Sequence, residues 1–161
     1  MIPIHQKITR EGTGFDASSW RGLLKLAWLA AGRLWHEGIL PKHFTRQGAT
    51  AYGYQPRSAA YMRHKGKRWG HQKPLVFRGD LDREVKRIRD VRATSKGSRV
   101  VLHGPRHLHA YRKNYNQPDK AAELRAVTEA EAGQDLAPAI DGTLQRAIDG
   151  EGRRKTVLFS G

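Results

Sequence analysis

Two stretches whose apolar residues recur every three or four positions bracket this 161-residue chain, and they restrict the folds open to it. Such spacing predicts amphipathic helices. We expect the first helix to begin at Asp16 or Ser18 and to end at Gly38 and Pro41. We expect the second helical region to follow Pro118, with a kink or break near Gly133–Pro138. The apolar positions are Trp20, Leu24, Ala27, Trp28, Ala31 and Trp35, then Leu124, Val127, Ala130, Leu136, Ile140, Leu144 and Ile148.

Between these helices the pattern shortens to that of strands and turns. Residues 42–54 suit a short helix that ends at Gly53, and residues 75–77 suit a short buried strand before a turn at Gly79. Residues 85–94 and 99–104 read as a hairpin around Gly97, and "KTVLFSG" at 155–161 as a last strand. The predicted fold class is α+β, with an N-terminal helix, a small antiparallel sheet, a long C-terminal helix and a tail strand. We expect an arm at 1–15, one domain at 16–152 containing a basic loop at 57–73, and a tail at 153–161.

The chain has few apolar residues, and the aromatic and apolar side chains that could contact another subunit lie in the first helix and in two short runs at 75–77 and 157–159. Hydrophobic residues make up 38% of the chain, so we expect part of its stability to come from partner subunits. The three tryptophans of the first helix suit either core packing or a ridge that contacts another subunit. The candidate contact residues are Trp20, Trp28, Trp35, Leu75, Val76, Phe77, Val157, Leu158 and Phe159.

Positive charge is high and unevenly distributed. The formal net charge is +15, and residues 39–78 hold nine Lys and Arg and no acid. Residues 119–161 hold eight acids against six bases. This pattern favours contact with nucleic acid, through backbone phosphates rather than base readout, or with an acidic protein partner. The candidate contacts are Arg57, Arg63, Lys65, Lys67, Arg68, Trp69 and Lys73, with Tyr61 interleaved among them.

Several kinds of chemistry find no support in the residues. The chain has no cysteine, which excludes disulfides, thiol catalysis and cysteine-ligated zinc. No phosphate-binding glycine motif or nucleophile elbow occurs, and His103, His107 and His109 lack a nearby carboxylate in sequence. The acidic set Asp80, Asp82 and Glu84 suits a helix start better than a magnesium site. We expect no metal, no cofactor and no enzymatic activity, and a soluble intracellular protein without a membrane span.

Two segments carry a resemblance to a known family. "KPLVFRGDLDREV" resembles a signature of tailed-phage tail-completion and neck proteins, with Pro74, Leu75, Val76, Gly79, Leu81 and Val85 in place. "NQPDKAAELRAVTEAEAGQDLAPAIDGTLQRAI" resembles their C-terminal helix, and "HFTRQGATAYGYQPRSAAY" resembles phage and prophage proteins of this type. Arg78 departs from the usual Thr or Ser, and Pro118-Asp119-Lys120 replaces an Arg-Pro-Phe segment.

The resemblance implies a structural virion protein at the head–tail junction or the head-proximal end of the tail. It implies a homo-oligomeric ring, six- or twelve-fold, that meets a head connector or adaptor on one side and tail-tube or tail-terminator proteins on the other. Phage double-stranded DNA would pass through the ring, and the subunit would reside in the host cytoplasm during assembly. The rival hypothesis from another class is a small basic nucleic-acid-binding protein without sequence specificity. A third, less favoured hypothesis is a nuclease or other metal enzyme that uses His103, His107 and His109.

Overall fold

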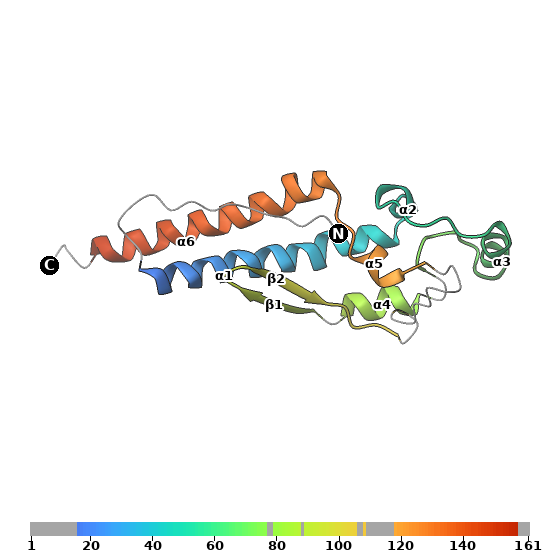
Figure 1. Cartoon of the computed structure of the whole chain (residues 1–161), viewed down its shortest axis with the longest axis horizontal. Helices are drawn as coiled ribbons and strands as arrows, with labels where there is room; N and C mark the ends of the chain where they lie inside the picture. Colours follow the sequence, from blue (N-terminus) through green and yellow to red (C-terminus); the bar gives the residue numbers. More distant parts are fainter. Residues whose placement is uncertain (1–15, 77–78, 88, 106–107, 109–117, 158–161) are drawn as a thin grey trace.

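A computed structural model describes residues 16–76, 79–87, 89–105, 108 and 118–157, the side chains of 151–157 excepted. The predicted α+β class is confirmed: the described chain holds helices, one two-stranded antiparallel sheet and a long C-terminal helix. Figure 1 shows an elongated molecule in which α1 (Ala17–Leu34) and α6 (Ala137–Val157) run antiparallel, with the sheet on the opposite side of α1. The predicted arm at 1–15 lies outside the described residues.

The first helix begins as its sequence predicts. Asp16 caps α1, and its carboxylate accepts the Ser19 backbone N–H at 2.6 Å. Leu23, Ala27 and Ala31 then pack into one core against Ile140 and the neighbouring part of α6. Helix α6, α1 and the sheet thereby form the layered body of the protein.

The described residues contain two π-helical turns, and each lies just before a proline. The helical run does not end at Gly38 as predicted. It continues from α1 through the π turn η1 (Trp35–Ile39) and the 3₁₀ turn η2 (Leu40–Phe44), and Pro41 lies inside η2. The break expected near Gly133–Pro138 is likewise a π turn, η5 (Glu131–Leu136), followed by α6. Proline has no N–H to donate, and its ring crowds the preceding turn of a helix. A wider π turn leaves room for the ring, so the helical run continues through the proline.

The hairpin is shorter than predicted. Residues 80–87 form helix α4 (Asp80–Arg87), and only β1 (Asp90–Thr94) pairs with β2 (Gly97–Val101), with Val91 opposite Val100. Alternation along the strands directs Val91 and Ser98 toward α1. Gly32 permits this close approach, because a Cβ atom at position 32 would lie 2.6 Å from Val91 Cγ1.

Three further predictions about local structure are wrong. The basic loop is helix α3 (Ala59–Trp69), which begins where Ser58 accepts the Tyr61 N–H and ends at left-handed Gly70. The strand expected at 75–77 does not begin at Leu75, which lies in a turn with φ 57°, and Phe77 lies outside the described residues. The tail strand is replaced through Val157 by helix α6, whose backbone satisfies its own hydrogen bonds without a neighbouring strand; residues 158–161 lie outside the described chain.

The predicted 42–54 helix is also divided. It consists of part of η2 and the short helix α2 (Gly48–Ala51), which ends two residues before the predicted Gly53; Gly53 lies in the following turn with a φ of 60°. An extended segment around Pro56 then leads to α3. Helix α5 (Lys120–Leu124) returns the chain to this region before η5. Helices α2, α3, α4 and α5 therefore gather at the end of the molecule opposite the C-terminus of α6 (Figure 1).

Candidate functional site

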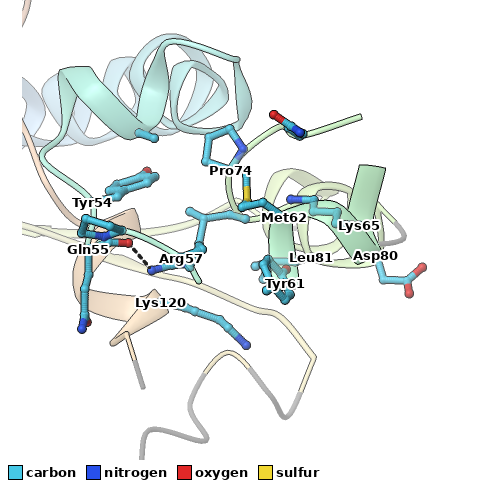
Figure 2. A pocket seen from close by; sticks show the side chains of 14 residues that line it. Tyr54, Gln55, Arg57, Tyr61, Met62, Lys65, Pro74, Asp80, Leu81 and Lys120 are labelled. Carbon is cyan, nitrogen blue, oxygen red and sulfur yellow. Dashed lines mark hydrogen bonds between the residues drawn. The ribbon is translucent and has the colours of Figure 1, made fainter. Parts of the chain in front are cut away.

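A cavity of about 610 Å³ lies between α3, α4 and α5, and it is the best candidate for a binding site in the described chain. Figure 2 shows Arg57 in its centre, with Lys65 and Lys120 extending from different elements. Three cations and one acid, Asp80, line the cavity, so its charge is positive. The apolar part of the wall comes from Tyr54, Pro56, Met62, Pro74, Leu75 and Leu81.

A bidentate ion pair fixes one side of the cavity. The Arg57 guanidinium donates to both carboxylate oxygens of Glu123, at 2.5 and 3.0 Å, and to the Gln55 carbonyl at 2.8 Å. Glu123 also accepts the Gln55 backbone N–H at 3.1 Å. The paired geometry of guanidinium and carboxylate holds the extended segment against α5. The charge of Arg57 is thus largely balanced within the chain.

The positive charges of the two cavity lysines, Lys65 and Lys120, are not neutralised by an ion pair within the described residues. Lys65 is 2% exposed, and its ammonium donates to the backbone carbonyl of Lys73 and lies 5.8 Å from the centre of the Tyr61 ring. The Lys120 side chain makes no hydrogen bond or ion pair within the described residues. Burial, followed by the charge of Arg57, lowers the pKa of both lysines, although Glu123 partly opposes this for Lys120.

The structure divides the predicted nucleic-acid contacts into two groups. Arg63, Lys67, Arg68 and Lys73 are exposed, and Arg68 lies over the half-buried ring of Trp69, 5.6 Å from its centre. Arg57 and Lys65 instead belong to the cavity, where one is paired and the other buried. The candidates that the sequence placed on one continuous loop therefore divide into exposed cations on and just after α3 and two residues that line the cavity.

The predicted subunit contacts are also divided. Trp35 and Val76 are buried in the core, and Trp20, Trp28 and Leu75 are partly buried against it. This places Trp35 in the core-packing interpretation. Phe77, Leu158 and Phe159 lie outside the described residues, and Val157 ends α6.

The most exposed large apolar side chain of the described chain was not among the predicted contacts. Leu26 on α1 is 53% exposed. Arg21, Lys25 and Arg33, on the same helix, are exposed as well. Its position in the sequence indicates this exposure, because Leu26 falls outside the apolar stripe of the first helix and therefore points away from the core.

A second polar cluster, which shares Tyr54 with the cavity wall, is built around His43 and Glu131. The His43 ring is fully buried, stacks on Tyr52 with centres 3.6 Å apart, and is hydrogen-bonded through Nδ1 to the Tyr54 hydroxyl at 2.5 Å. The Tyr52 hydroxyl donates to Glu131 at 2.7 Å, and Lys42 pairs with the same carboxylate at 3.2 Å. This network joins η2 and α2 to η5. We assign it a structural role, because its side chains pair mainly with one another across three elements; within the described residues, His43 Nε2 is the buried atom of the network without a hydrogen-bond partner.

The His43 network makes folding stability depend on pH. Burial lowers the pKa of His43 to about 4, and the opposing effects of Glu131 and of the Ala126 and Glu123 carbonyls are smaller. The unfolded chain therefore binds a proton at a higher pH than the native protein does. We expect full stability above about pH 6.5, and a loss that grows toward roughly 3 kcal/mol as the pH falls to about 4.

Urea unfolding at several pH values measures this dependence. The variant His43→Phe keeps an aromatic ring on Tyr52 and has no titrating group there, so it should be less stable at pH 7 but should lose less stability between pH 6.5 and 4.5. An unchanged pH slope in His43→Phe would assign the dependence to other groups.

The acidic cluster on α4 and the histidine cluster, both considered as metal sites from the sequence, contain side chains that form ion pairs or contacts with neighbouring residues. Asp80 pairs with Arg83 at 2.5 Å, and Asp82 pairs with Lys86, as expected for the first turn of a helix. His103 contacts Asp90 at 3.1 Å, whereas His107 and His109 lie outside the described residues. Within the described part of the chain, no three His, Asp or Glu side chains converge to hold a metal ion.

Comparison with known proteins finds no protein-family model, curated protein or solved structure that matches this chain. Among the described helices, none combines the length and apolar character needed to cross a membrane.

Proposed function

We propose that this chain is a structural subunit of a tailed bacteriophage, a tail-completion or neck protein that assembles with copies of itself. It would act without catalysis, by docking one face of the assembly on the head connector or its adaptor and the other on the tail end. In this proposal the protein resides in the virion at the head–tail junction or the head-proximal end of the tail.

The observation that carries the proposal is the incomplete sheet on α1. β1 and β2 form a sheet of two strands, and within the described residues neither outer edge is paired with a further strand. A two-stranded hairpin is marginal alone, and an open edge accepts a strand from another chain. Its support from α1 keeps the hairpin in place, and the exposed Leu26 on the same helix offers apolar contact area.

The segment that carries the family resemblance supports the proposal through its structural role. Gly79 has a φ of 88°, which favours glycine, and it precedes α4. Leu81 and Val85 on α4 are buried, and the Val85 carbonyl accepts a hydrogen bond from the buried His36 ring at 3.0 Å. The residues of the signature thus orient the turn and helix from which the hairpin departs.

Co-sedimentation with candidate neighbours tests the docking role. The full-length protein should co-sediment with the purified connector or tail-tube protein of the same phage, at about 0.15 M salt, where exposed charges beyond ~8 Å are screened. An unrelated acidic protein of similar size serves as the control. Equal recovery with both would reduce the interaction to nonspecific charge attraction and contradict the proposal.

A nucleic-acid-binding protein remains the second candidate, because α3 exposes Arg63, Lys67 and Arg68 on one helix. Filter binding of duplex DNA separates the two. Phosphate contacts release counterions, so duplex binding by either candidate should weaken between about 50 and 200 mM salt, and the affinity left at 200 mM separates the two: a structural subunit should keep no measurable duplex binding there. Binding by a monomer that persists at 200 mM salt would favour the second candidate.

A further inference from the structure

We propose that the cavity between α3, α4 and α5 is a binding site for an acidic, apolar peptide segment of a partner protein. The carboxylate of the segment would lie near Lys120 and Lys65, and an adjoining apolar side chain would lie against Pro56, Met62 and Leu81. This site is separate from the hairpin edge and from Leu26, so it does not rest on the proposed self-assembly.

The arrangement of charge indicates an anionic ligand. Arg57 is neutralised by Glu123, which faces it through both carboxylate oxygens. Asp80, the acid of the lining, is paired with Arg83 at 2.5 Å. Lys65 has a backbone carbonyl as its partner, and Lys120 has no ion pair among the described residues. Two cations from different helices therefore lie at one cavity without a carboxylate of their own, and a carboxylate supplied by a ligand would complete them.

The cavity wall favours a peptide over a nucleic acid. A duplex presents its phosphates on a convex surface and meets cations that project into solvent, whereas Lys65 is 2% exposed. The rest of the wall is apolar and includes two prolines and Met62, which suit an aliphatic or aromatic side chain. A volume of about 610 Å³ leaves room for a few side chains. The exposed cations of α3 lie outside this wall, so any duplex binding by them is a distinct property.

Fluorescence anisotropy with a labelled peptide of the sequence Gly-Glu-Phe-Glu-Leu-Gly tests the site on the full-length protein. The matched peptide Gly-Gln-Phe-Gln-Leu-Gly removes the charge and keeps the size. The variant Lys120→Gln removes one cavity cation, and Lys67→Gln removes one exposed cation of α3 as the matched control. Measurement at about 0.15 M salt limits long-range attraction.

We expect the Glu peptide to bind at least about tenfold tighter than the Gln peptide, which corresponds to ~1.4 kcal/mol. Lys120→Gln should weaken binding of the Glu peptide by about tenfold, the value of one hydrogen bond to a charged group, and Lys67→Gln by less than about twofold. Circular dichroism should show both variants folded.

Three results would overturn the proposal. Equal affinity for the two peptides would remove the role of the carboxylate. Equal weakening by Lys120→Gln and Lys67→Gln would place binding on the general positive surface. A labelled single-stranded oligothymidine that binds more tightly than the Glu peptide and depends on Lys120 but not on Lys67 would make the cavity a nucleic-acid site. None of these results bears on self-association, whose failure is measured separately by molar mass.

Discussion

Replacing Glu131 by alanine should lower the free energy of unfolding by about 3 kcal/mol, because it breaks three interactions of one buried carboxylate. Glu131 is 7% exposed. One carboxylate oxygen accepts the Thr128 backbone N–H at 3.1 Å, while the Thr128 hydroxyl accepts the Glu131 N–H at 3.2 Å. This reciprocal pair is a capping box that starts the C-terminal helical run. The other oxygen accepts from Tyr52 and Lys42.

The pKa of Glu131 reflects the same contacts. Burial alone would raise it, but hydrogen bonds from Tyr52, Thr128 and Lys42 bring the pKa below its ordinary value. The charged form is therefore the one that the fold stabilises. The contribution is present above the pKa of the unfolded carboxyl group and is lost as the pH falls through the lower pKa of the native protein.

Urea unfolding at pH 7 measures the effect of Glu131→Ala, and Asp135→Ala is the matched control. Asp135 also pairs with Lys42, at 3.3 Å, but its side chain is 43% exposed, so its loss should cost under about 1 kcal/mol. Equal destabilisation by the two variants would contradict the central position given to Glu131.

Replacing Leu26 by glutamate should abolish self-association and leave the folded subunit intact. Leu26 is 53% exposed, so the substitution removes little core contact and should change the stability of the monomer by less than about 0.5 kcal/mol. In an assembly that covers this part of α1, a buried leucine contributes about 1.5–3 kcal/mol per copy, and a buried unpaired carboxylate is costly. The combined effect at every interface of a ring should shift the population to monomers.

The variant Gln134→Glu is the control for Leu26→Glu. Gln134 is exposed on η5, so it adds the same charge away from α1. Size-exclusion chromatography with light scattering should show Gln134→Glu at the molar mass of the native chain and Leu26→Glu at 18.2 kDa. An undiminished oligomer in Leu26→Glu would place the interface elsewhere, with the hairpin edge as the remaining candidate.

Local sequence signals predicted the parts of the fold that depend on nearby residues. Asp16 caps α1, and the helical spacing of Ala27, Ala31 and Leu144 matches the buried faces of α1 and α6. Thr128 and Glu131 also have the three-residue spacing of a capping box, a local pattern typical of a helix start. Gly66 and Gly70 suggested a loop, yet Gly66 lies within α3 and only Gly70 ends it.

The candidate site could not be predicted in the same way, because it depends on residues far apart in the chain. Arg57 and Glu123 are 66 positions apart, and Lys120 of α5 lines the same cavity as residues of α3 and α4 that precede it by about 40 positions or more. The charge run suggested that Arg57 and Lys65 were free for a partner. Tertiary packing buried Lys65 and paired Arg57, which only a three-dimensional arrangement reveals.

The molar mass of the full-length protein in solution tests the central claim most directly. Light scattering across a hundredfold range of protein concentration, at about 0.15 M salt, should give one discrete multiple of 18.2 kDa, as a closed ring does. The resemblance to phage neck proteins predicts six or twelve copies. A mass of 18.2 kDa at every concentration, together with duplex binding that persists at about 0.2 M salt, would contradict the assembly role and favour a nucleic-acid-binding protein.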